Sequence, residues 1–430
     1  MKNDHLYIGT REIWGGEQPF GFEVAGARFH TYIIGKTGSG KTTLLRNLIL
    51  QLIEQGHGVG LIDPHGDLAD GLLDHIPPSR AEHTAYFHPG DIDFPIGLNL
   101  LAQAHPNERH LVSSGVVDAL KSIWHESWGP RMEYILHNTV AALAECENTS
   151  LLGVNRMLSD DFYRHWVVRQ LRDPFLRDYW VNEFESYDAR FRREAIAPIQ
   201  NKVGQLLLSP IIRNIIGQVR NRISIPLLMD NRRIFIANLA KGQIGSEQAN
   251  LLGSLLITQF QLAAMARHRQ PEADRPDFFL FVDEFQNFAT ESFTSILSEA
   301  RKFRLNLTLS HQYIAQLSPT VRDAVFGNVG TLVAFRSGYD DAEFLHGEFG
   351  KEFLPNQFVD LNRYETLIRH QAPDGRLHFQ RAKLDPPIET HRGNRQKLIA
   401  RSRERFATKR EVVERKLERW LRPLGKNSLW

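Results

Sequence analysis

The chain has 430 residues, 42% of them hydrophobic, and a formal net charge of +2. This length is enough for two domains, or for one large α/β domain with an insertion, and the composition is that of an ordinary globular protein. The single cysteine, Cys146, excludes an intramolecular disulfide and a cysteine-based metal cluster, which favours a reducing, cytoplasmic location.

The charge and the apolar residues are unevenly distributed. Residues 391–430 hold 13 Lys and Arg against 4 Asp and Glu, so residues 1–390 carry a net charge of −7. The longest apolar run, residues 251–266, is interrupted by polar side chains and is too short to cross a bilayer as a free helix. We therefore expect a soluble protein with no transmembrane segment of its own, which would need a partner to reach a membrane.

In chain order, residues 6–24 alternate weakly and contain several glycines, which predicts a short hairpin leading into the core. Residues 31–34 are apolar and residues 44–49 have helical spacing, so a strand, a glycine loop and a helix follow one another. Strands at 59–63 and 84–87 come next. This rhythm is typical of a doubly wound, mostly parallel α/β sheet.

The glycine loop satisfies the pattern G-x-x-x-x-G-K-[ST] of a phosphate-binding loop. Its glycines allow backbone N–H groups to point at an anion, Lys41 can reach the β- and γ-phosphates, and the Thr42 hydroxyl can bind Mg²⁺. An ordinary glycine-rich turn is the alternative, but the flanking strand and helix argue against it. We expect these residues to bind nucleotide: Gly35, Lys36, Thr37, Gly38, Ser39, Gly40, Lys41, Thr42 and Thr43.

Beyond residue 107 the pattern changes to long amphipathic helices, and strand signals return only at residues 233–239. This predicts an all-α domain inserted in the α/β core. The helices are expected at 107–125, 131–146, 160–170, 175–187 and 190–208. The expected division is a first part of the core at 1–103, the inserted domain at 104–220, a second part of the core at 221–388 and a basic helical tail at 389–430.

The second half returns to α/β patterns. We expect a helix over 246–266, a fully apolar strand over 278–282, a helix over 291–303, strands over 305–309 and 331–335, and an edge hairpin that pairs 364–369 with 376–382 across Pro373. In the tail, Val413, Leu417, Trp420 and Leu421 predict one apolar stripe on a helix whose opposite face is basic.

Acidic residues follow the apolar strand at 278–282. Asp283 at its carboxyl end can hold Mg²⁺, and Glu284 can polarise the attacking water, so the pair indicates hydrolysis rather than a simple helix cap. Gln312 ends the next strand and can sense the γ-phosphate, or be only a solvent-facing strand end. His311 is expected to be structural.

Arg301 and Arg304 lie one helix beyond the acidic pair. They are candidates for arginine fingers that reach a neighbour's γ-phosphate, with Arg301 favoured, and a positive helix end stabilised by the helix dipole is an equally weighted alternative. Asp63, His65 and Asp67 resemble a metal cluster, but Pro64 and Gly66 favour a tight turn at the edge of the nucleotide site.

The series GKTGSGKTT, LIDPHGDL, NLAKGQIG, FVDEFQNF, SEARKFRLNLTLSHQYIAQL and GTLVAFRSG resembles the FtsK/HerA class of P-loop ATPases. The cytoplasmic part of type IV secretion coupling proteins is most similar, over residues 5–385. The resemblance implies a RecA-like core, a hexameric ring with ATP sites between subunits, and DNA in a central pore. It also implies that Lys41 and Thr42 are the Walker A residues, Asp283 and Glu284 the Walker B pair, Gln312 the sensor and Arg301 the probable trans finger.

The sequence therefore predicts an ATP- and Mg²⁺-dependent DNA translocase, with a membrane channel or a nuclease as possible protein partners. A nucleotide-gated docking protein that recruits protein or nucleoprotein cargo is the main alternative, and a small-molecule kinase is disfavoured by Glu284 and by the large insertion. The residues do not separate conjugation, DNA processing and antiviral defence, nor do they distinguish single-stranded from double-stranded DNA.

Overall fold

Short strands that are apolar throughout alternate with helices in the first and last parts of the chain, as expected of a buried parallel sheet. A computed structural model describes residues 5–103, 106–289, 293–372 and 374–422. Contacts between residues divide the chain into two compact units. Unit 1 contains residues 1–87, 225–240 and 263–401, and unit 2 contains residues 88–224, 241–262 and 402–430. Each unit therefore draws on segments that are far apart in the sequence.

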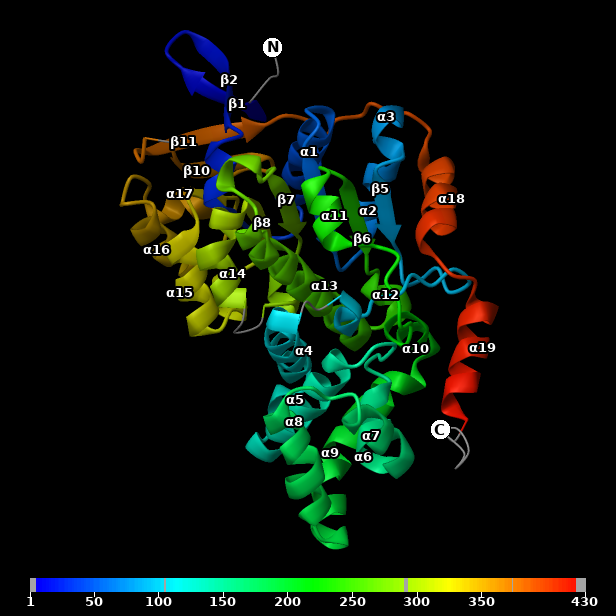
Figure 1. Cartoon of the computed structure of the whole chain (residues 1–430). Coiled ribbons are helices and arrows are strands. Elements are labelled where there is room, and N and C mark those ends of the chain that lie inside the picture. Colours follow the sequence, from blue (N-terminus) through cyan, green and yellow to red (C-terminus); the bar gives the residue numbers. More distant parts are fainter. Residues whose placement is uncertain (1–4, 104–105, 290–292, 373, 423–430) are drawn as a thin grey trace. The chain divides into compact units, whose positions relative to one another are not determined.

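Unit 1 is built on a mixed sheet, which has eleven strands among the residues that the structure describes (Figure 1). Seven neighbouring strands are parallel, and the other four add antiparallel to one side. In spatial order the strands are β2 (Gly16–Glu23), β1 (His5–Ile13), β11 (Leu377–Leu384), β10 (Glu365–Gln371), β9 (Thr331–Ala334), β3 (Thr31–Ile34), β8 (Leu305–His311), β7 (Phe278–Val282), β4 (Gly58–Asp63), β6 (Ile234–Asn238) and β5 (Thr84–Phe87).

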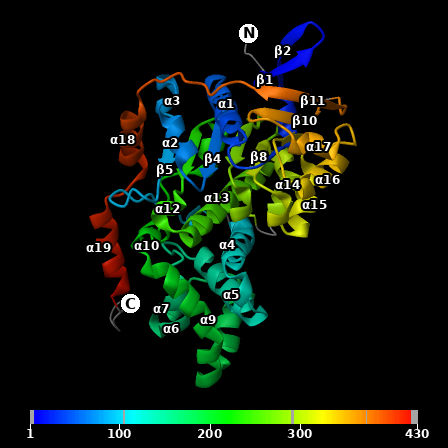
Figure 2. The same cartoon turned by 180° about the vertical axis from the view of Figure 1, so that it is seen from behind.

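The helices of unit 1 fill the connections between these strands. They are α1 (Lys41–Glu54), α2 (Asp67–Leu73), α3 (Pro78–Ala81), α11 (Ile225–Asp230), α14 (Phe293–Glu299), α15 (Pro319–Asn328), α16 (Tyr339–Glu348), α17 (Pro355–Val359) and most of α18 (Arg395–Phe406). Alternate strand residues such as Leu61, Ile236 and Phe281 join apolar residues of α1 and α2 in one core. Both views show α14, α15, α16 and α17 grouped together (Figures 1 and 2).

Unit 2 is helical, as the amphipathic pattern predicts. Its helices are α4 (Arg109–Ile123), α5 (Pro130–Glu145), α6 (Gly153–Ser159), α7 (Asp161–Val168), α8 (Pro174–Asp178), α9 (Ala189–Leu208), α10 (Pro210–Ile216), α12 (Lys241–Ile244), most of α13 (Ser246–Ala266) and α19 (Arg410–Leu421). Helix α5 packs against α4, α6 and α9 (Figure 2). In the described part of the chain, α13 with the short turn after it is the one segment long and apolar enough to cross a membrane, and most of it is buried.

The fold class is confirmed, and the structure corrects several expected elements. The hairpin β10–β11 is not at the edge of the sheet, because β1 pairs with β11 and leaves β2 outermost; Pro373 of its turn lies outside the described residues. The helix expected over 291–303 is α14 followed by a 3₁₀ turn, and residues 291–292 are not described. The helix expected over 175–187 is α8 followed by a π-helical stretch, Tyr179–Phe184.

The tail also differs from a single basic helix. It forms α18, whose Leu398 is buried in the core of unit 1, and α19, whose Val413 and Leu417 pack on Leu152 in unit 2. Leu421, expected in the apolar stripe, is exposed. The two units therefore do not follow the predicted domain limits of 104–220 and 389–430. Unit 2 also includes residues 241–262, and the tail is divided after residue 401, so it supplies core residues to each unit.

Candidate functional site

The loop between β3 and α1 has a backbone that favours glycine. Gly35 has φ +154°, and a Cβ atom there would lie 2.5 Å from Cβ of Phe335. Gly38 has φ +77°, in the left-handed region. Helix α1 starts at Lys41, and no side chain caps it. Its first backbone N–H groups can therefore donate to a ligand at the positive end of the helix dipole. The loop therefore fits an anionic group such as a phosphate.

Lys41 is buried beneath this loop, with 7% of its surface exposed. Its Nζ donates to the carbonyl oxygens of Gly35 at 2.5 Å and Lys36 at 3.3 Å. Burial lowers the pKa of Lys41, and the nearby charges of Glu284 and Asp283 act in the opposite direction. An ammonium group held in this way favours a negatively charged ligand, since phosphate oxygens would compensate its lost hydration better than neutral carbonyls.

Two carboxylates lie next to each other at the carboxyl ends of β4 and β7. These strands are parallel neighbours, with Ile62 opposite Val282, which brings Asp63 and Asp283 side by side. Burial and the charge of Asp63 raise the pKa of Asp283 from 3.8 to about 6. A divalent cation would relieve both effects, so Asp283 fits Mg²⁺, and the exposed Thr42 at the start of α1 offers a hydroxyl ligand from the neighbouring element.

Glu284 has an unusual backbone and well-defined partners. Its φ and ψ are +45° and +50°, in the left-handed region, which costs a residue other than glycine about 1–3 kcal/mol. One carboxylate oxygen accepts from Gln312 Nε2 at 2.7 Å, and the other accepts from Gln286 Nε2 at 2.6 Å. The structure therefore brings Gln312 to Glu284, from the neighbouring strand β8 to the residue that follows β7.

Sequence reasoning missed Gln286. The residue lies in a 3₁₀ turn, Phe285–Asn287, that begins after the left-handed Glu284 and folds the Gln286 amide back onto the carboxylate. The spacing Glu-x-Gln carries no signal of its own, because the contact depends on that local backbone conformation. The left-handed conformation is itself unexpected for glutamate.

The adjacent His311 is structural, in agreement with the sequence-based interpretation. It is fully buried, and its Nδ1 lies 2.8 Å from the hydroxyl of Tyr32. Burial and the charge of Lys41 lower its pKa to about 3, so the imidazole is neutral at physiological pH. The Tyr32–His311 contact links β3 to the end of β8, its parallel neighbour in the sheet.

Asp63, His65 and Asp67, which resemble a metal cluster in the sequence, form a turn, as expected. The two carboxylate oxygens of Asp63 accept from the backbone N–H groups of His65 and Ala69, each at 2.9 Å. This ties the start of α2 to the end of β4. Within the described residues, no three His, Cys, Asp or Glu side chains are grouped in a way that could hold a metal ion.

The two candidate arginine fingers are not brought to this site. Arg304 ends the turn before β8 in a left-handed conformation, and its carbonyl oxygen accepts from Phe278 at the start of β7. Arg301 is exposed, with its guanidinium carbon 3.7 Å from the centroid of the Phe29 ring, just before β3. Both lie at the amino edge of the sheet. The length of β8 separates them from Gln312 by roughly 20 Å.

Comparisons with known proteins agree with this geometry. Residues 15–260, more than half of the chain, match the sequence family described as the helicase HerA central domain. No curated protein sequence matches the chain. Among solved structures, the bacterial conjugative coupling protein TrwB has a TM-score of 0.59 at 14% identity and covers 89% of this chain and 90% of its own.

A structure of TrwB with a non-hydrolysable ATP analogue has a TM-score of 0.59 at 15% identity, over 86% of this chain and 88% of that one. VirB4 of Thermoanaerobacter pseudethanolicus has a TM-score of 0.56 at 13% identity, over 90% of this chain and 97% of that one. At these identities the structures show a shared fold, and the family match covers the phosphate-binding loop. The chain therefore belongs to the family of the HerA helicase central domain, as a P-loop nucleoside triphosphatase.

Proposed function

We propose that the protein is an ATP-hydrolysing motor that translocates DNA and works as a ring, most simply a hexamer, in the cytoplasm. The observation that carries the proposal is the grouping of Lys41, Asp283, Glu284 and Gln312 at the carboxyl edge of one sheet. Membership of the HerA family supports DNA as the track. The similar folds of TrwB, a conjugative coupling protein, and of VirB4 support a role in moving macromolecules.

Each residue has a proposed task. The N–H groups of residues 38–43 and the Lys41 ammonium bind and orient the triphosphate, while Glu284 accepts a proton from the attacking water. Thr42 and Asp283 would hold Mg²⁺, which supplies positive charge for the phosphate oxygens when bound. Gln312, which is bonded to Glu284, links that carboxylate to the state of the γ-phosphate.

The arginines fit a site that is completed by a second copy of the chain. Arg301 and Arg304 lie about the length of a strand from their own Lys41, so neither reaches a nucleotide on the same subunit. Both precede β8, at the amino ends of the parallel strands, where we propose that a neighbouring subunit of a ring meets them. An arginine supplied in trans stabilises charge on the transferred phosphoryl group, and it makes hydrolysis depend on assembly.

The deciding experiment measures ATPase activity of the purified chain alone, with single-stranded DNA and with double-stranded DNA. We expect DNA to stimulate the wild type. Glu284→Gln should still bind ATP but lose turnover, whereas Lys41→Ala should lose both. Equal, slow hydrolysis with and without DNA would contradict the translocase.

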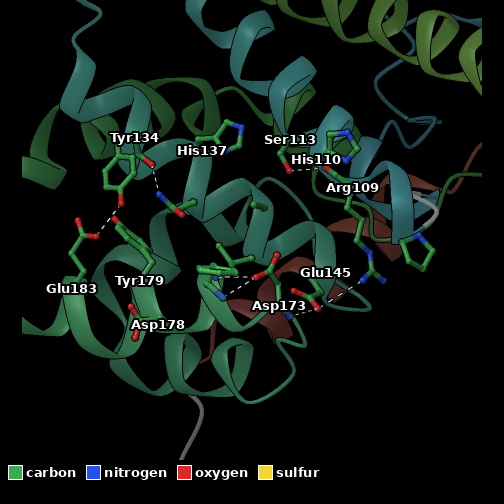
Figure 3. A pocket seen from close by; sticks show the side chains of 15 residues that line it. Arg109, His110, Ser113, Tyr134, His137, Glu145, Asp173, Asp178, Tyr179 and Glu183 are labelled. Atoms are coloured by element: carbon green, nitrogen blue, oxygen red, sulfur yellow. Dashed lines mark hydrogen bonds and ion pairs between the residues drawn. The ribbon is translucent and has the colours of Figure 1, made fainter.

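The alternative function, nucleotide-gated docking of cargo, has one observation in its favour. Unit 2 contains a hollow of about 590 Å³ between α4, α5 and α8 (Figure 3). Its lining includes the carboxylates of Glu145, Asp173, Asp178 and Glu183, against a single arginine. Phe175 is exposed beside them. This surface suits a lysine- or arginine-rich segment of a cargo protein.

The two functions make different predictions for one substitution. Glu183 accepts from the hydroxyls of Tyr134 and Tyr187, and Asp178 accepts from Asn182. Replacing Asp178 with Lys should abolish binding of a basic cargo peptide if the protein docks cargo. The same change should leave DNA-stimulated ATPase intact if the protein is a translocase.

A further inference from the structure

Five arginines of the basic tail, residues 391–430, pair with carboxylates of the chain itself. In unit 1, Arg392 pairs with Glu54 at 2.8 Å, Arg395 with Asp70 at 3.2 Å, and Arg401 with Glu82 at 3.2 Å. In unit 2, Arg403 pairs with Asp91 at 2.7 Å, and Arg410 with Glu414 at 2.8 Å. Four of these arginines therefore offset negative charge elsewhere in the chain, Arg410 offsets a glutamate of the tail, and the five are not free to bind a polyanion as a group.

Lys416 on α19 is different, because it faces a hollow with two arginines from another segment. The hollow is in unit 2, has a volume of about 560 Å³, and lies between residues 217–222 and α19. Arg220, Arg222 and Lys416 line it and are exposed, and no carboxylate is among its lining residues. Val413, Leu417 and Trp420 form an apolar wall on α19.

Both walls are held rigidly by contacts within unit 2. Asn221 exchanges two hydrogen bonds of 2.7 Å with the backbone of Asn99, and Gln218 donates to the carbonyl oxygens of Pro95 and Asn214. These anchors fix the 217–222 segment, while Arg220 and Arg222 are exposed. The segment thus presents cations on a fixed backbone.

The opposite wall is fixed through Trp420. The guanidinium of Arg156 lies 4.8 Å from the Trp420 ring and donates to its carbonyl oxygen at 2.6 Å. Arg156 is itself held by Asp160, and Tyr163 packs edge-on against Trp420. Gly217 lies so close to Leu417 that a Cβ atom there would approach it to 3.1 Å. The hollow is therefore part of the fold of unit 2 and not a gap beside a loose tail.

We propose that this hollow binds a segment of single-stranded DNA, with Arg220, Arg222 and Lys416 on its phosphates and an unpaired base against the apolar wall. Three exposed cations, with no acid among the residues that line the hollow, suit a polyanion. The cations are exposed, unlike those of an enclosed small-molecule pocket, which suits a strand that passes through. An apolar wall in a hollow of this size suits a base that is not stacked in a duplex.

This inference rests on the proposed DNA translocase, because it names the strand that unit 2 would hold. The test is fluorescence anisotropy of a labelled oligothymidylate on the full-length, nucleotide-free protein over a series of salt concentrations. The variant is Arg222→Ala/Lys416→Ala, one residue from each wall. The matched control is Arg415→Ala/Arg419→Ala, which removes the same charge from exposed positions on α19 outside the hollow.

Each phosphate contact on single-stranded DNA contributes about 0.7 to the slope of log affinity against log salt concentration. The double variant should therefore lower the slope by about 1.4 and weaken binding roughly 25-fold at 0.1 M salt. The control should leave both unchanged. An unchanged slope in the double variant, or an equal loss in the control, would overturn the inference.

Two further measurements distinguish the remaining occupants. A glutamate-rich peptide of equal charge should displace the strand poorly, and a duplex of the same length should bind without depending on Arg222 and Lys416. If the peptide displaced the single strand efficiently, or if duplex binding depended on Arg222 and Lys416 as much as single-strand binding does, the hollow would belong to another ligand. If DNA stimulates the wild-type ATPase but the slope does not change, the translocase stands and this site does not. If DNA does not stimulate the ATPase, the proposed function fails whatever the slope.

Discussion

The raised pKa of Asp283 predicts that removing its charge stabilises the nucleotide-free protein. Asp283 is 8% exposed, and burial together with the neighbouring Asp63 raises its pKa from 3.8 to about 6. At a pH between the unfolded pKa of 3.8 and the folded pKa of about 6, the Asp283 carboxyl group is protonated in the folded protein and ionised in the unfolded chain. The free energy of unfolding therefore falls as the pH rises through this range. The resulting cost to the folded state is about 1.6 kcal/mol at pH 5 and about 3 kcal/mol at pH 8.

Asp283→Asn should therefore raise the free energy of unfolding by about these amounts, because asparagine has the same shape and no charge. The assay is urea unfolding of protein freed of Mg²⁺ and nucleotide, at pH 5 and at pH 8. The same variant should lose hydrolysis, since Asp283 is the proposed ligand of Mg²⁺. A gain that is the same at both pH values, or a loss at pH 8, would refute the electrostatic reasoning.

Asp63→Asn is the matched control. Both carboxylate oxygens of Asp63 accept backbone N–H groups, from His65 and Ala69. Asparagine has only one such oxygen, and its NH₂ group would face a second donor, at a cost of about 1–3 kcal/mol. Two identical changes at neighbouring strand ends should thus have opposite signs. If Asp63→Asn stabilised the protein as Asp283→Asn is expected to, general relief of negative charge would explain both results.

Three other predictions follow from the contacts. Gln286→Ala should raise the DNA-independent ATPase rate severalfold, since it frees one oxygen of Glu284 for water; an unchanged or lower rate would show that the 2.6 Å bond does not restrain this carboxylate. Arg304→Ala should bind ATP normally yet lose turnover, and adding Lys41→Ala chains should restore part of the activity in mixed assemblies; no recovery would argue against a trans arginine. Leu398→Ala should cost about 2–4 kcal/mol of stability in urea, while Leu421→Ala should cost less than about 0.5 kcal/mol, because only the first is buried; equal effects would mean that α18 is not part of the core.

Much of unit 1 could be predicted from the sequence because its signals are local. A strand that is apolar at every position, such as 278–282, can only be buried on both faces, and the residue that follows it must come out at the carboxyl edge. This reasoning correctly placed Asp283 and Gln312 on one edge, as the register of β7 with β8 and the bond between Gln312 and Glu284 show. The phosphate-binding loop could be predicted for the same reason, because its pattern lies within residues 35–42.

Other features depend on pairings between distant segments, which a single sequence does not contain. The hairpin β10–β11 was expected at an edge because no local sequence pattern indicates that β1, more than 350 residues away, pairs with it. The tail was expected to be a basic helix with one apolar stripe formed by residues 413–421, yet Leu398 joins the core of unit 1. A surplus of nine positive charges is visible in the sequence, but the carboxylates that pair with five of the arginines are scattered from Glu54 to Glu414.

The position of the arginines makes the strongest argument for a site shared between copies. In a parallel sheet all carboxyl ends lie at one edge, so residues that follow strands meet, and residues that precede strands meet at the other edge. Lys41, Asp283 and Gln312 follow strands, whereas Arg301 and Arg304 precede β8. No rotation of side chains brings these two groups together within one subunit. If the arginines take part in hydrolysis, they must act on the nucleotide of a neighbour, and the activity must then depend on how the subunits meet.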